Sequence, residues 1–160
     1  MRSAPNTEEF VAELCAERDA AAAFIVLLKA EQEALRDGAA ADVERLAPDK
    51  VRMADALARY TSKRLEMLAA FGHERSALGM HAWADAHANN IAGVAAWQVL
   101  QEHAAEARAL NEANGKLIDL RLRHCRQALV ALEQACGTTT VYGPQGHTIA
   151  PPASRAVTAA

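Results

Sequence analysis

The sequence of 160 residues has a formal net charge of −3 and a pI near 6.1, which argues against a nucleic-acid-binding protein, because such proteins normally display a basic stripe. Hydrophobic residues make up 51% of the chain, but aromatic residues only 4%, and much of the hydrophobic share is alanine. Alanine favours helix and buries little area, so closely packed helices are expected and a thick globular core is not.

Cysteine usage and the N-terminal sequence indicate the compartment. Cys15, Cys125 and Cys136 are odd in number and show no CxxC spacing, which is typical of reduced thiols in a cytosolic protein. The first ten residues, MRSAPNTEEF, contain no apolar stretch, so no signal peptide is expected. No apolar stretch approaches the roughly 20 residues of a membrane span. We expect a cytoplasmic protein without membrane insertion.

A first long helix is predicted to begin at the N-cap residue Asn6 and to end at Gly38, a residue type common after a helix end. Apolar residues recur along it at alternating steps of three and four, or multiples of that rhythm, as in a coiled coil. They are Phe10, Leu14, Ala21, Phe24, Leu28 and Leu35, and the series is interrupted by Glu17 and Glu31.

A second long helix is expected over about 43–78, with Asp42 as its cap. Pro48 either kinks this helix or is its true first residue. Gly72 is expected inside the helix and Gly79 at its end. The apolar rhythm continues through Met53, Leu57, Tyr60, Met67, Phe71 and Leu78, with Lys50 and Arg64 as polar breaks.

Residues 80–90 are interpreted as a short helix that ends at Asn89-Asn90, and a third long helix is expected over about 91–136. After Cys136 the composition changes to Gly, Pro, Thr, Ser and Ala, which bury too little apolar surface to offset the entropy of ordering. The predicted fold is all-α: an elongated antiparallel bundle or coiled coil of three long helices with a short extra helix. Residues 1–136 form the helical domain, and 137–160 form a flexible C-terminal tail. The predicted seam of the last helix comprises Trp97, Leu100, Ala104, Ala107, Asn111, Asn114, Ile118, Leu122, Cys125, Leu129, Leu132 and Cys136.

The stretch LNEANGKLI at 110–118 contains Asn114-Gly115, which in isolation is a strong signal for a hairpin turn. A hairpin needs flanking strands, but AEARAL precedes the stretch and KLIDLRLRHCRQALVAL continues it, with the helical spacing intact. We therefore place Asn111, Asn114 and Gly115 inside the third long helix. Two interpretations remain open. The residues either set helix register, with a close helix crossing at Gly115, or form a weak point beyond which the amphipathic helix end binds a partner.

The segment LNEANGKLIDLRL, followed in the tail by VYGPQG, resembles the FlgN family of flagellar type III export chaperones. Trp97 near the start of the last long helix and ERSALG at 74–79 agree with this resemblance. The resemblance implies a cytoplasmic chaperone that binds the C-terminal helical segments of the hook-filament junction proteins FlgK and FlgL. It further implies that the chaperone prevents their premature assembly and delivers them to the type III export gate.

The resemblance places partner binding on the last long helix and export-gate docking at Tyr142 and Gly143 in the tail. Alternatively, Tyr142 packs back on the bundle. The apolar members of the partner-binding set form a stripe on which an amphipathic helix can lie, and the same stripe can pair with a second copy of the chain. The expected partner-binding residues are Asn111, Asn114, Gly115, Leu117, Ile118, Leu122, Leu129 and Leu132.

Other chemistry has weaker support in the sequence. His81 and Asp85 are four residues apart, but His87 would point away from the His81 face and no fourth ligand is evident, which favours polar helix surface over a metal site. No HExxH, GxSxG, P-loop or GxGxxG motif occurs. We therefore expect no enzymatic activity, cofactor or bound metal. The alternative to the chaperone is a generic helical scaffold in which the Asn-Gly motif only sets register.

Overall fold

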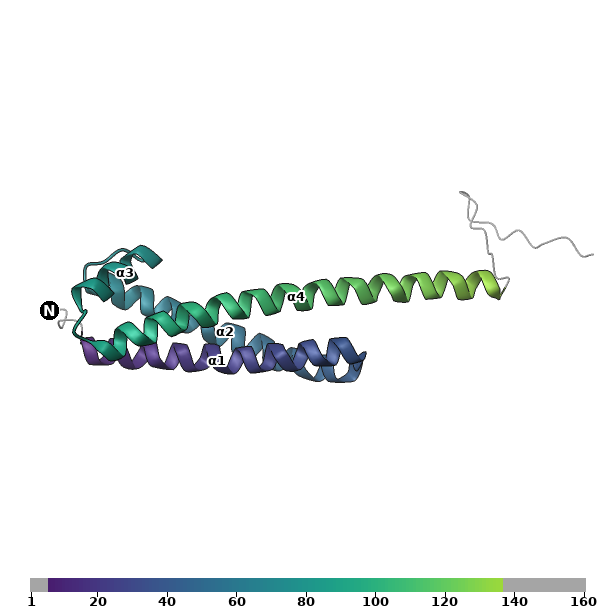
Figure 1. The fold of residues 1–160 in the computed structure, drawn as a ribbon, viewed down its shortest axis with the longest axis horizontal. Helices are drawn as coiled ribbons and strands as arrows, with labels where there is room; N and C mark the ends of the chain where they lie inside the picture. The colour runs from purple at the N-terminus through teal and green to yellow at the C-terminus, as the bar shows by residue number, and fades with distance from the viewer. Residues whose placement is uncertain (1–5, 137–160) are drawn as a thin grey trace, which may run out of the picture. The chain divides into compact units, whose positions relative to one another are not determined.

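A computed structural model of the chain describes residues 6–136 (Figure 1). This range contains α1 (Thr7–Asp37), α2 (Ala40–Ala70), α3 (Ala77–Ala86) and α4 (Ile91–Ala135). No strand occurs between residues 6 and 136, which confirms the expected all-α class. The chain divides into two compact units, one ending at Asp119 and one beginning at Leu120, and the predicted tail at 137–160 lies outside the described residues.

Helix α1 has the two caps that its sequence predicts. The Oδ1 atom of Asn6 accepts a hydrogen bond from the Glu8 N–H at 3.0 Å and so satisfies a donor of the first turn. Gly38 adopts φ 77° and ψ 18°, a left-handed conformation that costs glycine little, and its N–H donates to the Ala34 carbonyl. The expected roles of Asn6 and Gly38 are confirmed.

The start of α2 differs from the prediction. The helix covers Ala40–Ala70, whereas 43–78 was expected. Its N-cap residue is Ala39, which makes no side-chain cap bond, and Asp42 lies in the first turn. Pro48 is inside the helix and is not its first residue. Proline mainly disturbs the turn that precedes it, but residues 40–47 are helical all the same, and Val43 and Leu46 are half-buried there.

At the end of α2, Gly72 and Gly79 have the opposite roles to those predicted. Gly72, expected inside the helix, has φ 83° and ends it, and the His73 N–H donates back to the Leu68 carbonyl at 3.1 Å. Gly79, expected at the helix end, lies in α3. A Cβ atom at Gly79 would fall 1.9 Å from the Glu74 carbonyl oxygen, so the connection between α2 and α3 requires glycine there.

The short helix α3 covers Ala77–Ala86 and not the expected 80–90. Ser76 is its cap, and its Oγ accepts a hydrogen bond from the N–H three residues further on at 3.2 Å. Asn90, which was expected at the end of this helix, instead stands immediately before α4. Its Oδ1 accepts a hydrogen bond from the Gly93 N–H at 2.9 Å.

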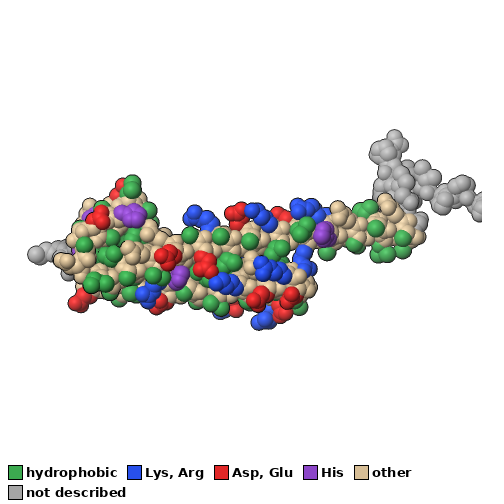
Figure 2. All heavy atoms as spheres, viewed as in Figure 1, with side chains coloured by type: hydrophobic (Ala, Val, Ile, Leu, Met, Phe, Trp, Pro, Cys, Tyr) green, Lys and Arg blue, Asp and Glu red, His purple; other side chains and the backbone are tan. Residues whose placement is uncertain are grey.

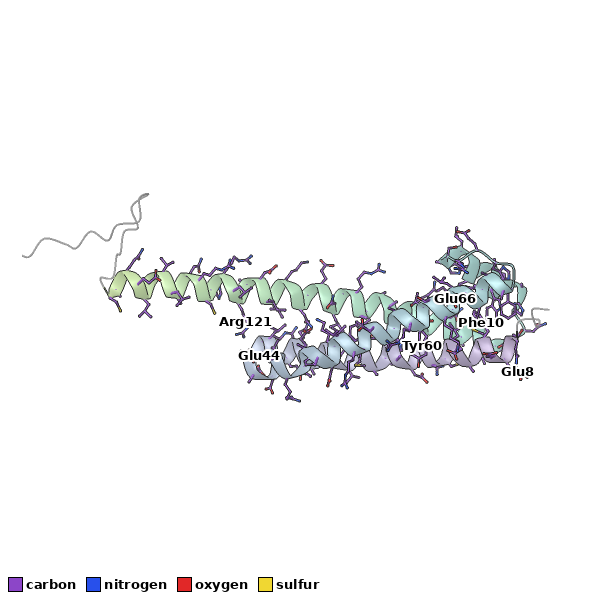
Figure 3. All side chains as sticks on the ribbon, turned by 180° about the vertical axis from the view of Figure 1, so that it is seen from behind. Glu8, Phe10, Glu44, Tyr60, Glu66 and Arg121 are labelled. Atoms are coloured by element: carbon purple, nitrogen blue, oxygen red, sulfur yellow. The ribbon has the colours of Figure 1, made fainter. Side chains whose placement is uncertain are left out.

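The main hydrophobic core lies where the start of α1, the end of α2, α3 and the start of α4 meet. Phe10, which is labelled in Figure 3, is fully buried. Its ring meets Phe71 and Trp83 edge to face at centroid distances of 5.4 and 4.7 Å. His87 stacks on Trp83 at 4.7 Å. Aromatic residues are scarce in this chain, and this cluster gathers several of them at one end of the first unit. The remaining buried members are Leu14, Ala21, Leu68, Met80, Ala96, Trp97 and Leu100.

Helices α1 and α2 form an antiparallel hairpin, and the first part of α4 runs parallel to α1 (Figure 1). The position of Gly93, near the start of α4, faces Val11, near the start of α1. Further along both helices, Asn114 contacts Leu28. The segment that contains α3 returns the chain to the start of α1, which gives α4 this direction.

Charged side chains of both signs cover the surface. On the face of residues 6–136 shown in Figure 2, acidic and basic groups are interspersed without a continuous basic stripe. Some pairs connect helices, such as Lys29 with Glu106 at 2.8 Å and Lys63 with Glu13. Such exposed pairs stabilise a fold by at most about 1 kcal/mol each, so the core and the buried contacts described below determine the packing.

Candidate partner-binding site

The segment around Asn114-Gly115 is helical. α4 runs without interruption over Ile91–Ala135, and within residues 6–136 positive φ angles occur only at Gly38 and Gly72. The placement of Asn111, Asn114 and Gly115 inside one long helix is thus confirmed, and a hairpin turn at this position is excluded.

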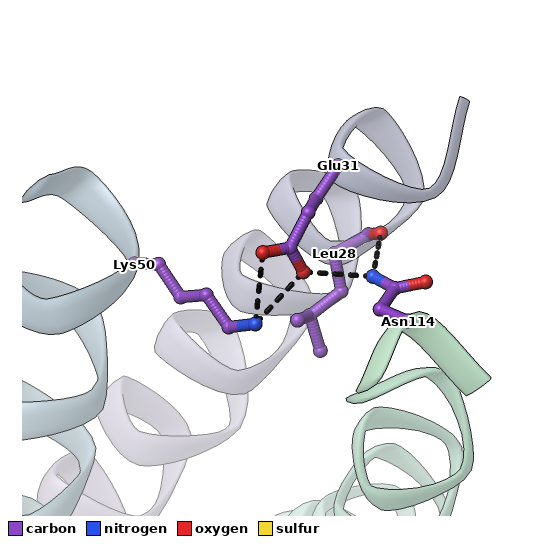
Figure 4. A network of polar contacts seen from close by, with 4 residues as sticks. All are labelled: Leu28, Glu31, Lys50 and Asn114. Atoms are coloured by element: carbon purple, nitrogen blue, oxygen red, sulfur yellow. Dashed lines mark hydrogen bonds and ion pairs between the residues drawn. The ribbon is translucent and has the colours of Figure 1, made fainter. Parts of the chain in front are cut away.

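Asn114 is fully buried and joins three helices (Figure 4). Its Nδ2 donates to the Leu28 carbonyl at 2.9 Å and to Glu31 Oε2 at 2.8 Å. The same carboxylate accepts two hydrogen bonds from Lys50 Nζ on α2, at 2.8 and 3.0 Å. A buried amide that bonds the carboxylate of a partly buried ion pair fixes the alignment of its helix, as a buried asparagine does in coiled coils.

A second polar cluster of related design lies around Glu17 of α1. Glu17 is 97% buried, and its carboxylate accepts hydrogen bonds from Arg64 at 2.7 Å and from the Thr61 hydroxyl at 2.9 Å, both on α2. The Arg64 guanidinium in turn lies 5.2 Å from the ring centroid of Trp97 on α4, in cation–π contact. This cluster therefore also connects α1, α2 and α4.

These two clusters explain the polar breaks in the predicted apolar series. Glu17 and Glu31 are two heptads apart on α1, and Lys50 and Arg64 are two heptads apart on α2. In the antiparallel hairpin each glutamate meets one cation. All four breaks are visible in the apolar spacing, but their pairing was not predicted. Their opposite charge and equal spacing are the signals that could have done so.

Two members of the predicted partner-binding set lie away from the bundle. Asn111 and Gly115 are both exposed, and a Cβ atom at Gly115 would meet no atom of another residue within 4 Å. The expected close helix crossing at Gly115 is therefore wrong. One residue is about 100° of rotation on a helix, so a buried Asn114 turns its neighbour Gly115 away from α1.

The inner face of α4 between Leu100 and Asn114 also differs from the predicted seam. His103 and Leu110 are half-buried there, whereas Ala104 and Asn111 are exposed. The Nδ1 atom of His103 is buried without a hydrogen-bond partner among the described residues. The sequence alone favoured alanine over histidine at a core position, and tertiary packing reversed that preference.

Leu117 and Ile118 are half-buried and close the first unit near its end. On the outer surface beside them, Lys116 Nζ lies 2.7 Å from Glu112 Oε1 one helical turn earlier. This hydrogen bond, together with the positive charge of Lys116, lowers the pKa of the Glu112 carboxyl. The Lys116–Glu112 contact next to the Asn-Gly segment is thus an ordinary surface ion pair between successive turns of a helix.

The second unit contains the rest of the predicted stripe. Leu122, Leu129 and Leu132 are 49, 59 and 60% exposed, and Cys125 and Cys136 are exposed as well. Their steps of three and four residues place all five on one face of the helix. Figure 2 shows hydrophobic side chains on the surface of these last described turns. Three large leucines on one water-facing side of a helix are typical of an unfilled binding surface.

The predicted export-gate element, Tyr142 with Gly143, lies outside the described residues. Its role, and the alternative in which Tyr142 packs on the bundle, both remain predictions.

Metal-binding and membrane-spanning features are absent from residues 6–136. No group of three or more His, Cys, Asp or Glu side chains in this range is placed to hold a metal ion. His87 instead stacks on Trp83, with its Nδ1 2.9 Å from the Trp83 carbonyl oxygen. None of the helices in the described range combines the length and the hydrophobicity that a membrane crossing requires.

Comparison with known proteins supplies one match. The family model described as "FlgN protein" matches residues 1–149 and so covers most of the chain. No curated protein matches the sequence. No solved structure matches it either.

Proposed function

The chain belongs to the FlgN family, a family of flagellar export chaperones, and on that premise we propose which clients it carries and where it binds them. Its clients are the hook-filament junction proteins FlgK and FlgL, bound through their C-terminal helical segments. In the cytoplasm the chaperone covers these segments, prevents premature assembly, and delivers its clients to the type III export gate. This role needs binding surfaces and no catalytic group.

The observation that carries the proposal is the exposed apolar face of residues 120–136. Leu122, Leu129 and Leu132 lie on one side of the helix and are each about half exposed or more. Because about half of each leucine is already covered, covering the rest contributes roughly 1–2 kcal/mol per side chain. An amphipathic client helix that lies along this face would bury all three, which is the helix-in-groove mode of recognition.

The residues just before this face suggest where the client contact ends along α4. Leu117 and Ile118 are half-buried, so they offer less free apolar surface than the leucines that follow. Asn114 is engaged with Leu28 and Glu31 and is not free to contact a client. We therefore place the client contact mainly on Leu122, Leu129 and Leu132. Asn114 keeps the first unit aligned, and Tyr142 and Gly143 serve export-gate docking.

The test compares two leucines on different faces of the same helix segment. Leu129→Asp should weaken binding of the C-terminal segments of FlgK and FlgL by at least about tenfold, because it puts a charge into the contact and removes an apolar anchor. Leu120→Asp is the matched control: Leu120 is 41% exposed and points away from the stripe, so affinity should change by less than about twofold. Titration calorimetry with the full-length chaperone measures both.

Two outcomes contradict the proposal. If neither FlgK nor FlgL binds the unmodified chain, the client assignment is wrong. If both leucine variants lose affinity equally, the stripe is not the contact. Deleting 137–160 tests the tail separately: client binding should persist while secretion falls, and unchanged secretion would remove Tyr142 from the mechanism.

A further inference from the structure

One cation of α2 differs from all the others on that helix. Arg59 is exposed and has no carboxylate partner among residues 6–136. Each of the other five cations of α2 has one: Arg45 pairs with Asp42, Lys50 with Glu31, Arg52 with Asp49, Lys63 with Glu13 and Arg64 with Glu17. The Arg59 guanidinium is therefore available to an acidic group from outside the described chain.

Arg59 also lines two neighbouring hollows on the surface of the first unit. One has a volume of about 250 Å³ and is lined by Glu13, Ala56, Arg59, Tyr60 and Lys63. The other has a volume of about 330 Å³ and is lined by Ala58, Arg59, Ser62, Lys63 and Glu66. Tyr60 and Glu66 are labelled on α2 in Figure 3. Pockets that enclose a whole drug-sized ligand measure roughly 300–1,000 Å³, so these small open hollows suit single side chains of a partner better.

The groups around the hollows favour a carboxylate as the ligand. The hydroxyls of Tyr60 and Ser62 make no hydrogen bond to another residue of the described range, so they are free donors beside the Arg59 guanidinium. The planar guanidinium matches the two oxygens of a carboxylate. Glu13 and Glu66 lie on the rims and would repel the double negative charge of a phosphate more strongly than the single charge of a carboxylate.

The face of α2 that leads to Arg59 is suited to a helix. Val51 is 61% exposed and lies eight residues before Arg59, which is about 12 Å along the helix. Ala54 and Ala58 are exposed between them, and the steps of three and four place both on the same face as Val51. Small side chains at these two positions let a second helix lie close to α2, and Val51 offers it an apolar contact.

We propose that this face of α2 docks an acidic amphipathic helix of a partner protein. One carboxylate of that helix pairs with Arg59, and an apolar side chain two helical turns away covers Val51. Lys63 keeps its bond to Glu13 and adds positive charge at the rim of both hollows. This docking face shares no residue with the client contact at Leu122, Leu129 and Leu132, and it does not depend on which clients the protein carries.

A pair of synthetic peptides tests the proposal on the full-length protein. One is a blocked, alanine-based helical peptide with a central glutamate and a leucine eight residues to either side, so that it can bind in both directions. Its counterpart carries glutamine in place of the glutamate. In NMR titrations the glutamate peptide should shift the amide signals of residues 51–63. It should bind about fivefold more tightly than the glutamine peptide, which is the upper range for one exposed ion pair.

Two arginine variants then assign the effect to one side chain. In Arg59→Gln the two peptides should bind with equal affinity, because the cation that distinguishes them is gone. Arg52→Gln is the matched control: Arg52 lies one heptad earlier on α2 and is already paired with Asp49, so the fivefold difference should persist. Both side chains are exposed, so both variants are expected to fold.

Four results would overturn the proposal. The two peptides could bind the unmodified chain equally, or Arg52→Gln could abolish the difference as Arg59→Gln does. Shifts confined to residues 120–136 would mean that the peptide occupies the client face, which contradicts docking on α2 and leaves the client proposal intact. Inorganic phosphate is the remaining probe: if it shifts the signals of Arg59 and Lys63 at lower concentration than the glutamate peptide does, the hollows hold a small anion and no helix.

Discussion

Replacing Asn114 by alanine tests whether the buried polar cluster holds α4 to the α1–α2 hairpin. The substitution removes two hydrogen bonds, one from Nδ2 to the Leu28 carbonyl and one to the Glu31 carboxylate. Glu31 keeps its ion pair with Lys50. The hairpin therefore stays paired, and the loss falls on the attachment of α4.

The expected magnitude follows from the contacts. A hydrogen bond to a charged group contributes about 1.5–3 kcal/mol and one to a neutral carbonyl about 0.5–1.5 kcal/mol. In the unmodified protein, part of the stabilisation from these two hydrogen bonds is offset, because Asn114 Oδ1 is buried without a partner and burying it costs about 1–3 kcal/mol. Alanine also favours helix by up to about 0.7 kcal/mol relative to asparagine. The free energy of unfolding should fall by about 1 kcal/mol.

Asn111→Ala is the matched control, because Asn111 lies on the same helix and is exposed. It gains the same helix propensity and loses no buried hydrogen bond. The difference between the Asn111→Ala and Asn114→Ala variants, measured by urea unfolding followed by circular dichroism, should be about 1.5–2 kcal/mol. Equal stability of the two variants would refute the assignment of Asn114 as the residue that holds α4.

Three further predictions concern other contacts. Gly115→Ala should raise the free energy of unfolding by about 1 kcal/mol, because the added methyl group meets open space and alanine favours helix; a decrease in urea unfolding would reveal a contact there. Glu17→Gln should lower it by about 3 kcal/mol, because a buried cation loses its partner, whereas Glu13→Gln, which alters an exposed pair, should lower it by less than about 1 kcal/mol. Glu112 should titrate with a pKa below its ordinary value in an NMR titration, and Lys116→Ala should raise that pKa. Because the pKa is lowered by folding, this pair stabilises the protein above the unfolded-state pKa of Glu112 and ceases to do so as the pH falls through the folded-state value; a Glu112 pKa that does not respond to Lys116→Ala contradicts this.

Features that local chemistry determines were predictable from the sequence. The caps of α1 at Asn6 and Gly38 depend on residues within one turn of them, and both were predicted. The helicity of Asn114-Gly115 followed from the composition on both sides, which outweighs one dipeptide. The limits of α4 at Ile91 and Ala135 fell close to the predicted 91–136.

Features that depend on distant parts of the chain were not predictable in the same way. Gly72 and Gly79 both interrupt one apolar series, and only the position of the Glu74 carbonyl shows why the second must be glycine. His103 occupies the inner face of α4 because Leu100 and Asn114 fix the rotation of the helix. Which of two neighbouring residues faces inward depends on contacts across the bundle, and periodicity alone leaves an uncertainty of one residue.

The candidate site was predictable in its composition and less so in its arrangement. The apolar stripe through Leu122, Leu129 and Leu132 was read directly from the spacing, and these residues are indeed exposed. Asn111 and Gly115 are exposed too and do not join the interface of the bundle, so their part in partner binding stays a prediction. Spacing identifies a common face, but it does not show where along the helix that face becomes free.

The paired glutamates and cations of the α1–α2 hairpin also restrict how the chain can misalign. If α2 slid by one heptad along α1, the Glu17 carboxylate would face Leu57 or Phe71 in place of Arg64, and a carboxylate would be desolvated without compensation. Alanine-rich surfaces alone would tolerate such a slide, since their small side chains are nearly interchangeable. The hairpin therefore folds in a single alignment, and α4 packs on one fixed surface.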